Sequence, residues 1–79
     1  MRLDKYLKVS RIIKRRTVAN EACDAGRVIV NGKPARASYD IKIGDKIEIM
    51  FGAREFKAEV VSVAETVKKD EASAMYKII

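Results

Sequence analysis

The sequence predicts an α+β domain in which two short N-terminal helices pack on a small, mostly antiparallel sheet of four to five strands. Two observations support this fold class. Apolar residues follow a helical period up to about residue 25 and then alternate as they do in strands. An Asn31-Gly32 pair, which is a strong hairpin signal, stands shortly after that change. A chain of 79 residues is expected to form a single domain, over residues 1–79.

The first helix is expected to run from Asp4, a candidate N-cap residue, to about Ser10. Leu3 and Leu7, together with Tyr6, fall on one side of it at helical spacing. That side should face the core. Tyr6 and Tyr39 are also the better candidates among the aromatic residues for stacking on a base, although packing is the more usual role.

The stretch RIIKRR that follows is expected to form a short connection, with Ile12 and Ile13 anchored inward and its four cations pointing outward. A second helix is expected from Thr17, a candidate cap, to Ala25. Gly26 stands where a left-handed residue commonly ends a helix. The apolar stripe of this helix should consist of Val18, Ala19, Ala22 and Cys23.

The strands are predicted from alternation. Residues 28–30 lead into the Asn31-Gly32 turn, and residues 33–37 return, with Pro34 making that strand an edge or an irregular piece. Two further strands are expected over residues 46–51 and 55–63. Their inward positions should be Ile47, Ile49, Phe51, Phe56, Ala58 and Val60. The tail, residues 66–79, can form one or two helical turns that pack back on the sheet.

The composition excludes several kinds of chemistry. The chain has one cysteine and no histidine, so it can form neither an intrachain disulfide nor a Cys/His metal cluster. Without histidine, a catalytic triad of the Ser-His-Asp type is also excluded. Cys23 is expected to be a small core residue. Neither a cofactor, a metal nor a catalytic residue is expected. The absence of a long apolar run fits a soluble protein in a reducing cytoplasm.

Positive charge is concentrated in the first half of the chain. Residues 1–37 carry a net charge of +7 and residues 38–79 a net charge of −1, which together give the +6 of the whole chain. Nucleic acid and an anionic membrane surface are both possible partners. Nucleic acid is favoured, because a membrane-bound helix needs a large apolar face and the apolar residues here must supply the only core.

The candidate RNA-binding residues are the cations that the two helices and their connection should present from a small surface. Arginine and lysine can contact phosphates, and arginine can also stack on a splayed base. Arg27 and Lys33 extend this basic face, although they serve solubility equally well. The full set is Arg2, Lys5, Lys8, Arg11, Lys14, Arg15 and Arg16, with Arg27 and Lys33.

Four segments in order, RLDKYL, RR-T-x-A, GRVIVNG and IKIGDKI, resemble the RNA-binding domain first described in ribosomal small-subunit protein four. This similarity covers about residues 1–50 and implies the alpha-L RNA-binding motif, with residues 51–79 as an added hairpin and C-terminal tail. It also implies that Arg2 and residues 14–16 grip RNA, Arg2 and Arg16 foremost, while Asp4 caps the helix and orients Arg2. Over all 79 residues the chain is similar to the family of ribosome-associated quality-control factors that stabilise the P-site tRNA.

That second resemblance implies a function. Such factors bind obstructed large ribosomal subunits in the bacterial cytoplasm and contact rRNA and peptidyl-tRNA. They hold the P-site tRNA while a partner of the Rqc2 type brings alanyl-tRNA, so that alanine is added to the stalled chain without mRNA. Relatives often continue with a further charged C-terminal stretch, which does not follow Ile79 here. The factor is expected to act as a monomer.

Two other functions remain open at this point. The chain can be a general binder of structured RNA, or a large-subunit recycling factor of the heat-shock type, without a role in tailing. It can also be a fragment of an RNA-modifying enzyme or a tRNA synthetase, because this domain often decorates such enzymes. The shortness of the chain and its lack of histidine argue against an enzyme.

Overall fold

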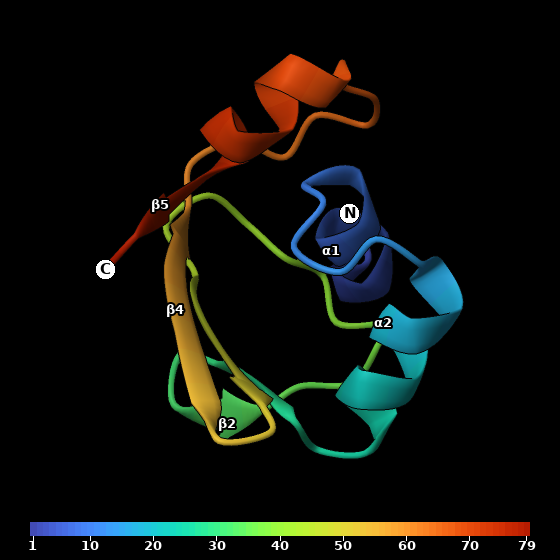
Figure 1. The fold of residues 1–79 in the computed structure, drawn as a ribbon, viewed down its shortest axis with the longest axis vertical. Helices are drawn as coiled ribbons and strands as arrows, with labels where there is room; N and C mark the ends of the chain where they lie inside the picture. Colours follow the sequence, from blue (N-terminus) through green and yellow to red (C-terminus); the bar gives the residue numbers. More distant parts are fainter.

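The computed structural model describes residues 1–79 and has two layers. Two α-helices, α1 (Leu3–Val9) and α2 (Arg16–Asp24), lie on one side of a five-stranded sheet (Figure 1). A 3-10 helix, η1 (Lys69–Met75), lies beside α1 near the end of the chain. The predicted α+β class is therefore confirmed. No helix is both long and apolar enough to cross a membrane.

The sheet is antiparallel throughout. Its strands are β1 (Val28–Val30), β2 (Lys33–Pro34), β3 (Lys46–Phe51), β4 (Arg54–Val60) and β5 (Tyr76–Ile78), and they lie in the order β2-β1-β3-β4-β5. The expected return strand is only two residues long and forms one edge, where Pro34 removes no needed donor. The other edge is β5, which lies in the tail where only helical turns were expected.

The predicted hairpin between β1 and β2 is present. Asn31 and Gly32 have φ angles of 52° and 85°, so both central residues of the turn are left-handed, as the type I′ turn requires. The side chain of Asn31 also donates to Asp45 (3.0 Å) and accepts from the backbone N–H of Lys46 (3.0 Å). The turn is thereby joined to the start of β3.

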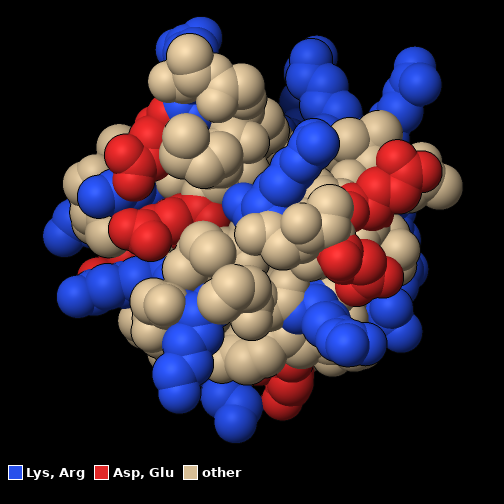
Figure 2. Space-filling model, turned by 90° about the horizontal axis from the view of Figure 1, so that it is seen from below, with Lys and Arg blue, Asp and Glu red and all other residues tan.

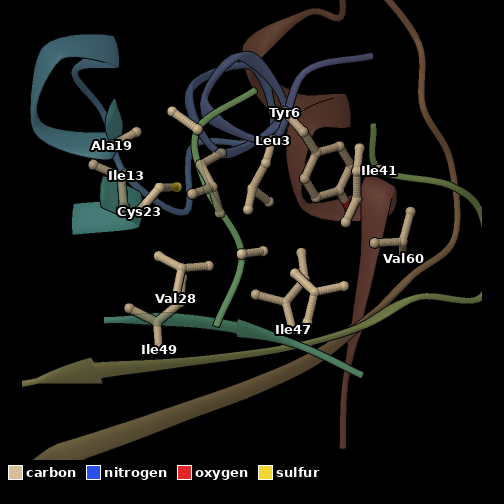
Figure 3. Packing of buried hydrophobic residues seen from close by; sticks show 14 of the residues in the cluster. Leu3, Tyr6, Ile13, Ala19, Cys23, Val28, Ile41, Ile47, Ile49 and Val60 are labelled. Carbon is tan, nitrogen blue, oxygen red and sulfur yellow. The ribbon is translucent and has the colours of Figure 1, made fainter. Parts of the chain in front are cut away.

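Fifteen buried residues form the core, between the helices and the sheet (Figure 3). Leu3, Tyr6 and Leu7 of α1 are fully buried, and Ile13 of the connection is 7% exposed. The inward positions of β1, β3 and β4 meet them from below in that view. The full cluster is Leu3, Tyr6, Leu7, Ile13, Ala19, Cys23, Val28, Val30, Ala35, Ala37, Ile41, Ile47, Ile49, Val60 and Met75.

Two residues expected in the core are exposed. Val18 is 47% exposed, because α2 turns the neighbouring Ala19 and Cys23 toward the core. Phe51 is 44% exposed, because it is the last residue of β3 and lies beside the turn into β4. It packs edge-on against Phe56, with 6.3 Å between the ring centroids.

Neither predicted helix cap is present. Arg2 occupies the N-cap position of α1 and Arg15 that of α2, and no side chain caps either helix. The prediction for Asp4 was wrong because the N–H groups of Leu3 and Asp4 donate to the carbonyls of Tyr39 (2.8 Å) and Ala37 (3.2 Å). A backbone segment of the chain thus does the work of the cap. Thr17 is not a cap because α2 begins one residue before it.

The end of α2 agrees with the prediction. Gly26 has a φ of 78°. Its N–H donates to the carbonyl of Cys23 (3.0 Å), and the N–H of Arg27 donates to that of Ala22 (3.0 Å). These two bonds make a Schellman motif, which needs a left-handed residue at the position of Gly26. The chain then enters β1 directly.

Asp4 joins α1 to α2. Its side chain is only 3% exposed. It accepts hydrogen bonds from Nδ2 of Asn20 (3.2 Å) and from Nε of Arg16 (3.4 Å), both on α2. It also accepts from Nε of Arg2 (3.1 Å). Burial alone would raise the pKa of this carboxyl, but these donors, the N–H of Lys5 and the charge of Arg16 outweigh burial and lower the pKa below 3.8.

Tyr6 joins α1 to the tail. Its buried hydroxyl donates to the carbonyl of Met75 (2.8 Å), the last residue of η1. The N–H groups of Val61 (2.8 Å) and Ser62 (3.1 Å) donate to the same carbonyl. The carbonyl oxygen of Met75 in η1 therefore accepts hydrogen bonds both from α1 and from the segment that follows β4. This is why the tail, far away in sequence, is packed beside the N-terminal helix.

Replacing Tyr6 by Phe should lower the free energy of unfolding by about 1 kcal/mol, because one buried hydrogen bond is lost while the carbonyl of Met75 keeps its backbone donors. Thermal unfolding followed by circular dichroism measures this change. Tyr39→Phe is the control, since Tyr39 is 39% exposed. Equal effects of the two substitutions would contradict the role given to the Tyr6 hydroxyl.

Replacing Asp4 by Asn should lower stability at neutral pH by about 1–3 kcal/mol, because two arginines lose a charged acceptor. The folded-state pKa of Asp4 lies below its unfolded value of 3.8, so its contribution is present above that value and is lost as the pH falls through the folded pKa. Urea unfolding from neutral pH to about pH 2 should therefore show a shallower acid loss for Asp4→Asn than for wild type. The exposed Asp70→Asn should keep the wild-type profile.

Candidate nucleic-acid interface

Five of the candidate cations surround one hollow in the surface, of about 440 Å³. We call it the basic hollow. Its walls come from α1, from the connection between the helices, from the start of α2 and from residues 65–67. The lining residues are Lys5, Lys8, Val9, Arg11, Lys14, Arg16, Glu65, Thr66 and Val67. Five positive groups around one small concave surface make a site for anionic groups.

The connection between the helices is tight and places two of these cations. The buried Ser10 ends α1, and its hydroxyl donates to the carbonyl of Leu7 (3.3 Å). Three residues later Ile13 anchors in the core. Arg11, between them, has a φ of 63°, a left-handed conformation that costs a non-glycine residue about 1–2 kcal/mol. Strain of this kind at an exposed cation is typical of functional sites.

Asp4 positions Arg2 and Arg16. The Nε atoms of the two arginines bind opposite oxygens of this buried carboxylate, at 3.1 Å and 3.4 Å. Their side chains are about half exposed, at 51% and 49%. Each guanidinium group is therefore held at one edge and keeps donors directed to solvent. Although Arg2 and Arg16 stand at the two ends of the basic stretch, Asp4 brings them together.

Arg16 lies between two hollows. The second, of about 370 Å³, is lined by Asp4, Arg16, Thr17, Asn20 and Glu21. Arg16 also lines the basic hollow, so it is the one predicted cation that belongs to both surfaces. The remaining predicted residues lie outside both hollows. Arg15 is exposed at the start of α2, Arg27 follows its end, and Lys33 is exposed on the edge strand β2.

Two contributors to the site were not anticipated. Asn20 stands one helical turn after Arg16, so its spacing on α2 could have revealed that both face Asp4. Residues 65–67 carry no such signal, because they lie about fifty residues beyond the basic stretch in the sequence. Glu65 forms an ion pair with Lys5. The hydrogen bond from Lys5 and its positive charge lower the pKa of the Glu65 carboxyl.

Charge elsewhere on the surface is mixed. Figure 2 shows a face on which most Lys and Arg side chains project around the rim, with Asp and Glu side chains among them and uncharged atoms over much of the middle. The net charge of +6 is therefore not spread as one continuous cationic face over the side that this view shows. What distinguishes the basic hollow is the convergence of cations from three neighbouring segments.

Two groups that could have carried other functions are buried. Burial raises the pKa of Cys23 to about 11, so its thiol stays protonated and poorly nucleophilic near neutral pH. Tyr6 is fully buried and bonded to Met75, so it cannot stack on a base. Cys23 is confirmed as a core residue. The site can bind anions through its cations, and these two groups add no chemistry to it.

Comparisons with known proteins identify the family of the chain. The model of the S4 domain family matches residues 1–47. The RQC P-site tRNA stabilizing factor of Streptococcus pneumoniae is 54% identical over 79 residues, which is 100% of this chain and 90% of the relative. The factor of the same name from Bacillus subtilis is 51% identical over 79 residues, 100% of this chain and 92% of the relative.

The fold of the chain is also similar to that of a solved structure. The trimeric structure of Vibrio cholerae Heat Shock Protein 15 matches with a TM-score of 0.92 at 29% identity, covering 100% of this chain and 81% of that chain. An uncharacterized RNA pseudouridine synthase of Chlorobaculum parvum is 39% identical over 51 residues, but this is only 16% of that enzyme. The chain belongs to the S4-domain proteins and, among them, to the family of RQC P-site tRNA stabilizing factors.

Proposed function

We propose that this protein is a non-enzymatic RNA-binding factor of ribosome-associated quality control in the bacterial cytoplasm. It binds obstructed large ribosomal subunits, contacts rRNA and peptidyl-tRNA, and stabilises the tRNA in the P site. It thereby supports the mRNA-independent addition of C-terminal alanine to stalled chains, together with an Rqc2-type factor that brings alanyl-tRNA. The full-length similarity to P-site tRNA stabilizing factors supports this proposal.

The observation that carries the proposal is the convergence of Lys5, Lys8, Arg11, Lys14 and Arg16 on the basic hollow. RNA presents phosphates at fixed spacing along a shaped backbone, and a concave set of cations on short rigid elements can match that spacing. Arg2 and Arg16, fixed by Asp4, add planar donors at one side. Arg15, Arg27 and Lys33 are exposed cations outside the hollow, and their contact with RNA is part of the proposal.

A binding role without catalysis is supported by the shares of the chains that match. The part shared with the pseudouridine synthase is a small fraction of that enzyme, whereas nearly the whole length of the P-site factors is matched. The enzyme hypothesis would be revived if the purified chain modified any base in ribosomal or transfer RNA, which mass spectrometry of the digested RNA can detect.

A second function is favoured by one observation, the close match to a heat shock protein structure. Under this alternative the protein binds large subunits or structured RNA and has no role in tailing. Deleting the gene and measuring C-terminal alanine tails on stalled chains separates the two. Loss of tails supports the proposed function, and unchanged tails favour the alternative.

The direct test is sedimentation. Tagged protein should migrate with large subunits that carry peptidyl-tRNA, and pull-down should recover rRNA, tRNA and the Rqc2-type partner. Binding only to free mRNA, or equally to all 70S particles, would rule out the proposed function.

Replacing Arg16 by Ala should weaken binding to large subunits about tenfold, because a guanidinium group bridging the two hollows is lost. The slope of log K against log salt should become shallower by about 0.7–0.9 if Arg16 contacts one phosphate. Arg2→Ala should act in the same direction, because Arg2 shares the Asp4 carboxylate with Arg16.

Arg54→Ala is the matched control, since Arg54 is exposed at the turn between β3 and β4, outside both hollows. Circular dichroism should show that all three variants are folded. Wild-type binding by Arg16→Ala, or an equal loss in Arg54→Ala, would remove Arg16 from the interface.

Replacing Arg11 by Gly should separate stability from binding. Glycine relieves the left-handed strain at this position but increases the entropy of the unfolded chain, so the free energy of unfolding should stay level or rise by up to about 1 kcal/mol. Affinity for large subunits should nevertheless fall, because one cation leaves the basic hollow. Urea unfolding and filter binding measure the two effects. A loss of stability together with intact binding would show that Arg11 serves the fold alone.

A further inference from the structure

Glu65 is the only acidic residue that lines the basic hollow. Its carboxylate forms an ion pair with Nζ of Lys5, which is one of the five cations there. The two residues stand sixty positions apart in the sequence, so this contact is made by the fold rather than by a local helix spacing. Within the hollow, Nζ of Lys5 is thus already paired with a carboxylate of the same chain.

The backbone around Glu65 is held in place. Val63 and Val67, two residues before and two residues after it, are half-buried and pack against the core. Val67 also lines the hollow itself. Between these two anchors the side chain of Glu65 is 67% exposed and that of Lys5 is 37% exposed. The main chain at Glu65 is thus anchored, while its carboxylate, paired with Lys5, is exposed to solvent.

An exposed ion pair of this kind contributes little to stability, because water screens both charges. It is therefore easily broken by a stronger anion. A phosphate group offers several charged oxygens and can bind Lys5 together with neighbouring cations such as Lys8 and Arg11, whereas the Glu65 carboxylate pairs with Lys5 alone. The balance between the two anions depends on how many cations the phosphate reaches at once.

We propose that Glu65 is a specificity-determining residue, an internal anion that holds Lys5 until an RNA phosphate seated in the basic hollow displaces it. This inference rests on the proposed function, because it concerns the same RNA-binding surface. An RNA of matching shape brings its phosphate to several cations and replaces Glu65. An RNA that touches only Lys5 must compete with the carboxylate and binds weakly. Glu65 thus selects shaped RNA over arbitrary polyanion.

The test measures how tightly the full chain and its Glu65→Gln variant bind two probes that contain RNA. The probes are a generic RNA duplex and the large subunit carrying peptidyl-tRNA. Glu65→Gln keeps the size of the side chain and removes its charge. Affinity for the duplex should rise about two- to fivefold, while affinity for the subunit changes less, so the ratio between them falls. Glu71→Gln, which removes an exposed charge outside the hollow, is the matched control.

The Lys5→Gln background shows whether Glu65 acts through Lys5. If it does, adding Glu65→Gln to Lys5→Gln should raise duplex affinity no more than Glu71→Gln does. A full increase in that background would mean that Glu65 acts only through its general charge and would overturn the displacement proposal. So would equal effects of Glu65→Gln and Glu71→Gln in the wild-type background.

Failure of the proposed function gives a different result. If the chain does not bind RNA through the basic hollow at all, the wild-type chain would bind neither large subunits nor duplex at physiological salt, whatever stands at position 65, and if only the role in tailing fails, alanine tails would be unchanged on gene deletion while both probes still bind. Binding by the wild-type chain with no selective effect of Glu65→Gln would overturn this inference alone. Thermal unfolding should show all variants folded, since the side chains of Lys5 and Glu65 are outside the core.

Discussion

The buried carboxylate of Asp4 is the constraint on which the arrangement of the N-terminal half depends. A carboxylate removed from water is unfavourable unless charged partners and hydrogen bonds surround it. Here Arg2, Arg16 and Asn20 all donate to it, and they come from both ends of the basic stretch and from α2. Satisfying one acid therefore fixes the relation of α1 to α2. The positions of the outward-facing cations depend on how α1 is held against α2.

The local features of the fold were predictable because they depend on neighbours in the sequence. The Asn31-Gly32 turn, the Gly26 helix end and the inward Leu3, Tyr6 and Leu7 follow from backbone preference and periodicity, and the structure confirms them. Long-range contacts were not predictable in this way. The strand β5 needs β4 as its partner, and the start of α1 is capped by the distant 37–39 segment rather than by Asp4. Periodicity also cannot tell that Phe51 lies where the core ends.

In the candidate site, too, the local features were predictable from the sequence and the long-range contacts were not. The cations of α1, the connection and α2 could be named from the sequence because their charge density is local. Their grouping could not, since it takes the left-handed Arg11 and the anchored Ile13 to turn five of them toward one hollow and leave Arg15 outside. Glu65 enters through the tail, which the Tyr6 hydroxyl holds beside α1. Whether these residues bind RNA stays a prediction.

Asp4 and Glu65 bind different cations of the basic stretch, and their burial decides how lasting each contact is. Asp4 is almost wholly buried, so it is a permanent partner that orients Arg2 and Arg16 without leaving them. Glu65 is exposed, so solvent screening makes its pair with Lys5 easy to replace. On the proposed function, one acid keeps the arginines ordered before RNA arrives, which lowers the entropy lost on binding. The other keeps a lysine occupied until the right phosphate reaches it. A small basic domain can in this way bind a shaped RNA with more discrimination than its net charge would give.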